Sequence, residues 1–405
     1  MKIETITGLD IGTTKTCAVV ASVTPGGLDI IGVGEAPSAG LRRGVITDLE
    51  ETIHSIEAAM ERAERMAGVQ ISQVYVGMTG EHVQSTNNRG VVAIASEERE
   101  VGSSDVRRCV DVSKLIDVAA DRQIIHALPR RFSVDGHDGV ADPIGLSGGR
   151  LEVETHIVTA GAAFIANVLK CVQRAGLESA GLVFEPFASS AATLSQEEKQ
   201  VGVVLLDIGG GTTDLIVYAG GSVVHSAVIP VGGNVVTNDI AVGLKTAFAE
   251  AETIKRTYGM GLADDGEVDA GFPVRMLDGR VKQMVTRAQL RGVVAPRIFE
   301  LFRMVKADVG EHVPRDHVIA EVVLTGGGAN LRGIEGFAGE HFGVPVRIGV
   351  PRAVGGLMDA IKQPQYATAV GLTLFGSKSE GALNGARRRK NIFTGAAAWL
   401  SDLWN

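Results

Sequence analysis

Two aspartates lie at the ends of apolar runs, and each is followed by a turn rich in glycine and threonine. The run Val203–Leu206 ends at Asp207, and Ile-Gly-Gly-Gly-Thr-Thr-Asp then precedes a second apolar run, Leu215–Tyr218. Near the N-terminus, Asp10-Ile-Gly-Thr-Thr-Lys likewise separates two apolar runs. Because glycine alone readily adopts the φ > 0 conformations of a tight turn, both stretches predict a β-hairpin.

Each predicted turn has the composition of a phosphate-binding loop, in which backbone N–H groups close around phosphate oxygens. The candidate phosphate ligands are Gly12, Thr13, Thr14, Lys15, Gly209, Gly210, Gly211, Thr212 and Thr213. Asp10 and Asp207 are candidates for holding Mg²⁺, usually through its waters. One such turn is equally compatible with an ordinary hairpin. A second copy about half a chain away favours two similar halves that face each other across a cleft.

A third glycine run follows another apolar strand and leads toward a predicted helix at Ile334–Phe342. Its residues are candidates for the nucleoside side of a site: Gly326, Gly327, Gly328 and Ala329. Leu331 stands where a dinucleotide-binding fingerprint requires glycine, and the chain has no Gly-x-x-x-x-Gly-Lys-Ser/Thr sequence. Two phosphate hairpins and one nucleoside loop, in this order, form a specific pattern.

These motifs resemble those of the actin/Hsp70/sugar-kinase superfamily. Asp10–Lys15 and Asp207–Asp214 are similar to its two phosphate motifs, and Thr325–Asn330 to its adenosine motif. Glu185–Ala192 and Tyr366–Gly371 are similar to its connecting helices. Within the superfamily, essentially the whole chain resembles the FtsA family of bacterial cell-division proteins. That closer resemblance rests on Asn-Val-Val-Thr-Asn-Asp-Ile from residue 234, Ala-Glu-Thr-Ile-Lys from residue 251, and a basic, then amphipathic tail.

The resemblance implies an α/β fold: a two-lobed actin-like ATPase with duplicated β-sheet halves, a small α/β insertion and a C-terminal amphipathic helix. We expect residues 1–80 and 161–200 in the first lobe, 81–160 in the insertion, 201–231 and 307–376 in the second lobe, 232–306 in its small subdomain, 377–390 in a basic linker and 391–405 in the amphipathic helix. Within the insertion we expect a turn at Asn87–Gly90 and no phosphate or metal site. The resemblance implies that this insertion contacts other division proteins or neighbouring subunits.

A further group of residues has candidate roles at the same cleft. Glu252 and Lys255, at i and i+3 of a predicted helix, are implied to lie over the nucleoside, together with Gly233; taken alone, the pair would be a solvated ion pair. Glu185 and Asp207 are the candidate catalytic residues, with Glu185 orienting a water or a Mg²⁺ ligand. The alternative for Glu185 is a carboxylate that is favoured by the dipole at a helix N-terminus.

A long amphipathic helix is predicted from Gln289 to Val309 and bears Arg291, Arg297, Arg303 and Lys306. Most basic helix faces are simply solvated. FtsA proteins, however, bind the acidic C-terminal peptide of FtsZ through this subdomain. The resemblance therefore makes Arg297 and Arg303 the candidate FtsZ contacts.

The tail combines a stretch of linker composition from Ser377 with a basic cluster and an apolar helical face. The candidate membrane contacts are Arg387, Arg388, Arg389, Lys390, Ile392, Phe393, Trp399, Leu400, Leu403 and Trp404. Tryptophan prefers the headgroup boundary, and cations favour anionic lipid. A helix over residues 391–405 is about 22 Å long, too short to span a bilayer. The alternative is a helix docked on the protein's own core.

Composition sets further bounds on the 405-residue chain. It is 45% hydrophobic, which allows a large core and more than one domain. No apolar run approaches the ~20 residues of a membrane span, and the N-terminus lacks a signal-peptide pattern. Three widely spaced cysteines fit a reducing cytoplasm. The net charge of −8 argues against nucleic-acid binding. The nine histidines show no His-Glu-x-x-His spacing and are expected to be surface or packed residues rather than ligands.

The expected function is therefore an ATP- and Mg²⁺-binding cell-division protein on the cytoplasmic face of the membrane at the division site. It would self-associate into filaments, anchor FtsZ and recruit other division proteins, with slow or negligible hydrolysis. The alternatives are a soluble kinase of the same superfamily and a related actin-like adaptor of pilus assembly. The kinase would need an acceptor pocket with a general base, and neither alternative explains the tail.

Overall fold

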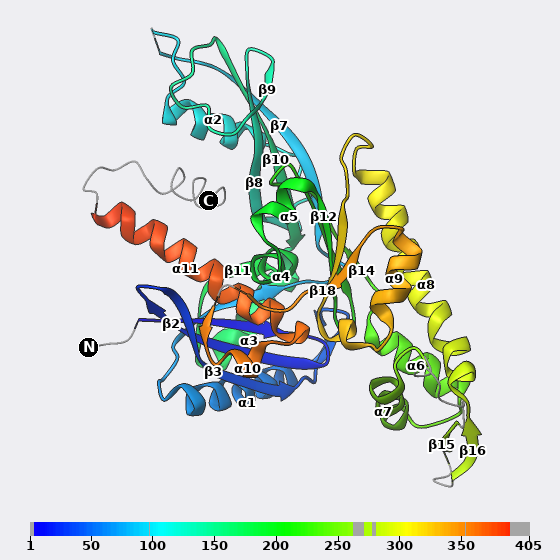
Figure 1. Cartoon of the computed structure of the whole chain (residues 1–405). Coiled ribbons are helices and arrows are strands. Elements are labelled where there is room, and N and C mark those ends of the chain that lie inside the picture. Colours follow the sequence, from blue (N-terminus) through cyan, green and yellow to red (C-terminus); the bar gives the residue numbers. More distant parts are fainter. Residues whose placement is uncertain (1–3, 97, 262–270, 278–280, 353, 389–405) are drawn as a thin grey trace.

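The computed structural model describes residues 4–96, 98–261, 271–277, 281–352 and 354–388. Two β-sheets lie on either side of a pair of central helices, and a third sheet lies at the top of the view, in contact with both (Figure 1). Each sheet has its own apolar core, and a shared core joins the first two through the central helices.

The first sheet carries the N-terminal hairpin. In spatial order its strands are β11 (Glu178–Phe184), β6 (Gln73–Met78), β1 (Thr5–Ile11), β2 (Lys15–Thr24), β3 (Gly27–Pro37) and β19 (Gly355–Gly356). Strand alternation sends Leu9 to one face, against α1 (Leu49–Ala67) and α3 (Ala162–Arg174). It sends Cys17 and Val19 to the other face, against the central helices. Asp48 caps the start of α1, and Gly68, in the left-handed conformation, ends it. The short strands β4 (Leu41–Arg42) and β5 (Val45–Ile46) pair beside this sheet.

The second sheet repeats this plan. Its strands, in spatial order, are β14 (Ser222–Ile229), β13 (Thr213–Ala219), β12 (Val203–Ile208), β17 (Glu321–Thr325) and β18 (Val346–Ile348). The β12–β13 hairpin is antiparallel, and β17 joins β12 in parallel. The hairpin predicted around Asp207 is thus confirmed. Asp207 lies one residue before the end of β12, as Asp10 lies one residue before the end of β1.

The two central helices are α4 (Glu185–Thr193) and α11 (Ala367–Arg388), the predicted connecting helices, with α5 (Gln196–Val201) following α4. They cross closely: a Cβ on Gly371 would lie 1.8 Å from the carbonyl oxygen of Ala188. Helix α11 also contacts β1, β2 and β6, while α4 contacts β12 and β13. The pair therefore links the two sheets at the base of the space between them.

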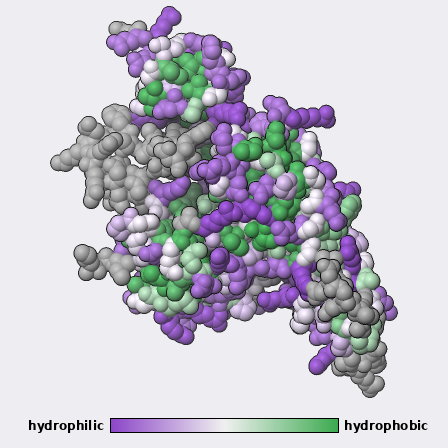
Figure 2. Space-filling view, viewed as in Figure 1, coloured by the Kyte–Doolittle hydropathy of each residue, from purple (hydrophilic) through white to green (hydrophobic). Residues whose placement is uncertain are grey.

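The third sheet belongs to the insertion and is ordered β7 (Gln84–Ala93), β10 (Arg150–Gly161), β8 (Arg122–Val134) and β9 (His137–Val140), with α2 (Ser103–Ser113) packed on it. The turn predicted at Asn87–Gly90 is wrong, because these residues lie inside β7. Long pairing with β10 outweighs their turn propensity, and Asn87 and Asn88 donate side-chain hydrogen bonds to Val224 and Ser113 carbonyls. Figure 2 shows apolar residues gathered over this subdomain, near the top of the view.

The small subdomain of the second half contains α6 (Gly233–Gly243), α7 (Phe248–Tyr258), the pair β15 (Phe272–Arg275) and β16 (Val281–Val285), and α8 (Arg287–His312). The remaining elements are the 3₁₀ turns η1 (Gly327–Asn330) and η2 (Pro364–Tyr366), with α9 (Ile334–Phe342) and α10 (Met358–Ile361). Helix α8 is one continuous element and runs through the boundary expected at residue 306.

Residues 377–388 of the stretch expected to be a basic linker belong to helix α11. Ser, Gly and Asn occur in this stretch, yet its Leu, Ala and Arg residues favour helix and the preceding turns have already nucleated it. The membrane contacts predicted from Arg389 to Trp404 lie outside the described residues. Within the residues that were described, no helix is both long and apolar enough to cross a membrane.

Candidate functional site

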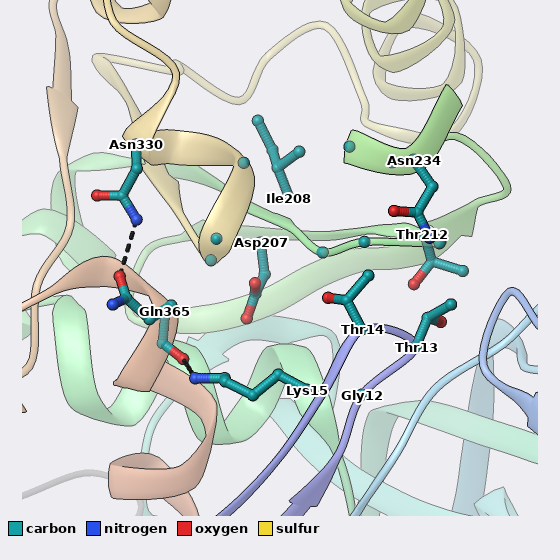
Figure 3. A pocket seen from close by; sticks show the side chains of 18 of the residues that line it. Gly12, Thr13, Thr14, Lys15, Asp207, Ile208, Thr212, Asn234, Asn330 and Gln365 are labelled. Carbon is teal, nitrogen blue, oxygen red and sulfur yellow. Dashed lines mark hydrogen bonds between the residues drawn. The ribbon is translucent and has the colours of Figure 1, made fainter. Parts of the chain in front are cut away.

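A cavity of about 590 Å³ opens between the two main sheets, above α4 and α11. Both glycine hairpins, η1, α6, α7 and α8 contribute to its wall. Figure 3 shows the N-terminal turn and the Asp207 hairpin facing each other, with Asp207 between them and the η1 loop. The topology thus brings together at one place three motifs that are far apart in the sequence.

The two hairpin turns touch, and glycine permits the contact. A Cβ on Gly210 would lie 2.5 Å from Thr14 Cγ2, and one on Gly211 would lie 2.6 Å from Thr13 Oγ1. Each turn is closed at its base by a backbone hydrogen bond, from Gly12 to Lys15 and from Gly209 to Thr212. Among the described residues, the N–H groups of Thr13, Thr14, Gly210 and Gly211 have no protein acceptor. Unpaired amides on two adjoining turns form an anion-binding concavity.

Four carboxylates from both halves surround the floor of this cavity: Asp10, Glu185, Asp207 and Asp214. Burial raises the pKa of Asp10 to about 7; the Lys15 ammonium opposes this rise, and the charges of Asp207 and Glu35 add to it. Burial and then the charges of Asp10, Asp214 and Asp207 raise the pKa of Glu185 well above its ordinary value. Burial and the charge of Asp207 do the same to Asp214. Such a cluster favours a bound cation, which would offset the repulsion among the carboxylates.

Hydroxyl groups orient two of these carboxylates. Thr368 of α11 donates to Asp207 Oδ2 at 2.7 Å, and Thr79, just after β6, donates to Asp214 Oδ1. The second of these bonds joins the two halves of the molecule, since β6 and β13 belong to different sheets. Both carboxylates are therefore fixed in direction before any ligand arrives.

Lys15 is the cation of the cavity floor. Its Nζ donates to the Gln365 carbonyl oxygen at 2.8 Å and lies 4.3 Å from the centre of the Tyr366 ring. Gln365 in turn accepts a side-chain hydrogen bond from Asn330 at 2.8 Å (Figure 3). The ammonium is thus held beside η2, within the cavity and next to Asp10.

The far end of the cavity is built by η1, α6 and α7. Gly326 has φ = 79°, and a Cβ there would lie 2.2 Å from Asp207 Oδ1, so only glycine fits beside that carboxylate. Lys255 Nζ lies 2.7 Å from Glu252 Oε2 and donates to the Gly233 carbonyl at 3.1 Å. Thr237 donates to the same Glu252 carboxylate at 2.6 Å. The Glu252–Lys255 ion pair is therefore anchored to α6 and is not simply solvated.

Most predicted ligands meet in this cavity. The wall contains Asp10, Gly12, Thr13, Thr14, Lys15, Glu185, Asp207, Gly209, Gly210, Gly211, Thr212, Gly233, Glu252, Lys255, Gly326, Gly327 and Gly328. Thr213 and Ala329 lie just behind it. Thr213 Oγ1 donates to the Val231 carbonyl, and Ala329 is buried within η1.

The two arginines predicted for FtsZ binding are separated by the structure. Arg297 is part of the cavity wall, where its guanidinium bonds Asp239 at 2.6 Å and also Glu300. Arg303 lies further along α8 and is exposed. An acidic peptide would have to displace two carboxylates from Arg297, whereas Arg303 is open to solvent.

Sequence reasoning missed several wall residues: Glu35, Thr79, Asp214, Asn234, Phe248, Arg256, Ile298, Leu301, Leu331, Gln363, Gln365 and Thr368. Asp214 lies inside the second motif. In the predicted hairpin it pairs with Asp207 on the neighbouring strand, so its place in the site could have been inferred from the sequence. Thr79 carried no local signal. Thr368 lies inside the connecting-helix motif Tyr366–Gly371, but its contact with Asp207 arises only through tertiary packing.

Family models match two parts of the chain: "Cell division protein FtsA" over residues 204–371 and "SHS2 domain inserted in FTSA" over residues 80–159. The cell division protein FtsA of Pseudomonas aeruginosa is 41% identical over 376 residues, covering 93% of this chain and 90% of that protein. FtsA of Escherichia coli strain K12 is 37% identical over 407 residues, covering 98% and 96%. FtsA of Bacillus subtilis strain 168 is 36% identical over 376 residues, covering 93% and 84%.

Solved structures resemble the fold at lower identity. A PilM–PilN complex of type IV pilus biogenesis matches with a TM-score of 0.67 at 20% identity, covering 92% of this chain and 98% of that one. MreB5 of Spiroplasma citri bound to ADP matches with a TM-score of 0.59 at 16% identity, covering 96% and 99%. These neighbours establish an actin-like ATPase fold. Together with the near full-length relatives, they show that the chain belongs to the FtsA family of actin-like cell-division proteins.

Proposed function

We propose that this protein binds Mg-ATP in the cavity between its two halves and uses the nucleotide to control self-association at the membrane. The observation that carries the proposal is the pair of touching glycine turns, whose free amides stand beside four buried carboxylates and one lysine. Free amides suit phosphate oxygens, carboxylates suit a hydrated Mg²⁺, and the chain supplies both within one cavity.

Each candidate ligand has a place in this proposal. The amides of Thr13, Thr14, Gly210 and Gly211 and the Lys15 ammonium would hold phosphates, and Asp10 and Asp207 would hold Mg²⁺ through its waters. Mg²⁺ supplies charge neutralisation for the phosphates when bound. Glu252, Lys255 and the η1 glycines would border the nucleoside. The solved MreB5 structure carries ADP in the same fold, which supports this assignment.

Hydrolysis is a secondary part of the proposal. Glu185 begins α4 and lies at the cavity floor, so it would orient a water near the terminal phosphate. Burial, the first cause of its raised pKa, remains when Mg-ATP is bound, and a carboxyl held toward its protonated form is a poor general base. We therefore propose slow turnover, with ATP acting mainly as a conformational and assembly ligand.

Calorimetric titration with Mg-ATP tests the nucleotide proposal. Lys15→Met keeps most of the unbranched side chain but removes its charge, and should weaken binding at least about tenfold, or ~1.4 kcal/mol. Lys170→Met, at an exposed position on α3, is the matched control and should bind as the native chain does. Equal affinity in all three proteins would refute the assignment of this cavity.

The cellular role rests on the family and on the tail. We propose that the C-terminal segment from Arg387 to Trp404 binds the inner face of the cytoplasmic membrane at the division site, and that the chain anchors FtsZ there and recruits other division proteins. Flotation with anionic vesicles should carry the native chain and leave Trp399→Glu/Trp404→Glu behind. If the double variant floats equally well, the tail is not the anchor.

The FtsZ contact is proposed at the exposed part of α8. Arg303→Glu should weaken binding of an acidic FtsZ C-terminal peptide, while the Lys170→Met control should not. Peptide binding would also separate this function from that of a soluble kinase or a pilus-assembly adaptor. Unchanged peptide affinity in Arg303→Glu would mean that Arg303 does not contact the FtsZ peptide.

A further inference from the structure

Three side chains with metal-binding donors meet far from the nucleotide cavity. His225 comes from β14, while Asp308 and His312 lie one turn apart near the C-terminal end of α8. His225 Nε2 lies 2.7 Å from Asp308 Oδ2, and His312 Nδ1 lies 3.4 Å from Asp308 Oδ1. One ligand atom from each residue can be chosen so that all three lie within 4.8 Å of one another. Within the described ranges, no other His, Cys, Asp and Glu side chains form such a group.

The rings of the two histidines are stacked in parallel, with centroids 4.6 Å apart and planes 4° apart. This stacking aligns the two imidazole rings beside one carboxylate. Asp308 then faces both rings with one carboxylate oxygen each. Two imidazoles and one carboxylate form a donor set that suits Zn²⁺ and similar ions rather than Mg²⁺.

The surroundings also favour a cation. His312 is the last residue of α8, where unpaired carbonyls give the helix end a partial negative charge. The His225 and Asp308 side chains are 10% and 25% exposed, whereas that of His312 is 47% exposed. Ligand atoms around a four-coordinate Zn²⁺ are about 3.3 Å apart. The exposed His312 can close the remaining distance, because among the described residues its polar contacts are to Asp308 alone, one turn earlier in its own helix.

We propose that His225, Asp308 and His312 bind one divalent cation of the Zn²⁺ class, which fastens the end of α8 to β14. A water would complete the four ligands. Strand β14 also carries the contacts to the insertion, since Ser226 accepts a hydrogen bond from Ser85 and bonds His156. The ion would therefore stabilise the junction of three parts: the second sheet, α8 and the insertion.

The competing explanation is a purely structural His–Asp–His hydrogen-bonded stack. Such a stack needs no metal and would be unaffected by its removal. The two explanations predict different results with Co²⁺, which replaces Zn²⁺ in protein sites. A metal site would bind Co²⁺ and change its absorption in the visible range, whereas a hydrogen-bonded stack would not.

The experiment titrates Co²⁺ into the full, tag-free chain in the presence of excess Mg²⁺, with absorption in the visible range as the readout. We expect one equivalent to bind, and added Zn²⁺ to displace it. His312→Ala removes the most exposed ligand and should bind at least about tenfold more weakly. His54→Ala, an exposed histidine beside Glu57 on α1, is the matched control and should bind normally.

A second readout is the melting temperature. Zn²⁺ should raise it for the native chain and for His54→Ala, but not for His312→Ala. Asp308→Asn keeps the shape of the carboxylate and carries the same test if His312→Ala folds poorly. Absence of Co²⁺ binding to the native chain, or binding that both substitutions leave intact, would overturn the proposal in favour of the structural stack.

Discussion

At the scale of single residues, the cavity floor brings buried carboxylates together, and this favours binding of a proton or a cation. Burial and neighbouring charges raise the pKa of Asp10 from 3.8 to about 7. The folded chain therefore binds a proton more tightly than the unfolded chain between these pH values. The contribution of Asp10 to stability is fully present below pH 3.8 and is lost as the pH rises to about 7.

Asp10→Asn should remove this dependence on pH. The measurement is urea unfolding in the presence of EDTA. Between pH 5 and pH 7, the free energy of unfolding of Asp10→Asn should rise relative to that of the native chain by about 1–3 kcal/mol. Above pH 7 the difference between the two proteins should stay constant. Asp138→Asn, at an exposed position on β9, should follow the native curve. Parallel curves for the native chain and Asp10→Asn would show that the carboxylate ionises without cost.

At the scale of elements, the crossing of α4 and α11 is the point where the two halves are joined most tightly. Gly371→Ala would place a Cβ 1.8 Å from the Ala188 carbonyl oxygen, so the helices must separate. We expect a loss of about 1–3 kcal/mol in the free energy of unfolding, measured with urea. ATP affinity should fall as well, because Thr368 on α11 orients Asp207.

The matched control for this crossing is Gly310→Ala on α8, where a Cβ meets nothing within 4 Å. It should stabilise the chain by about 0.5–1 kcal/mol, since alanine favours helix over glycine. Equal stability of Gly371→Ala and the native chain would mean that α4 and α11 can slide apart freely.

The elements that the sequence predicts well are those with local signals. Both hairpins follow from apolar runs broken by glycine, and α1 follows from its Asp48 cap and its Gly68 stop. Asn87–Gly90 has the composition of a turn, but β10 and α2 hold it as a strand. The Arg297–Asp239 ion pair and the donors Thr79 and Thr368 depend on residues 58, 135 and 161 positions away. No local pattern could have revealed these partners.

At the scale of the whole molecule, the cavity belongs to neither half alone. Asp10 and the first turn come from one sheet, Asp207 and the second turn from the other, and the carboxylates of the two halves repel each other. Mg-ATP would replace this repulsion with contacts to both turns. We therefore expect hydrogen exchange to slow at residues 12–15 and 209–213 together when Mg-ATP is added.

The variant Gly211→Ala tests whether the two halves close on the nucleotide together or bind it independently. Its Cβ would lie 2.6 Å from Thr13 Oγ1 and 2.9 Å from the Cα of Arg43, and a backbone atom cannot rotate away. The turns must move apart, so protection should be lost at the first turn as well as at the substituted one. Gly336→Ala, on α9, places its Cβ in open space and should keep the protection of both turns. If the first turn stays protected in Gly211→Ala, the two halves hold the nucleotide separately, and closure cannot be what couples ATP to assembly.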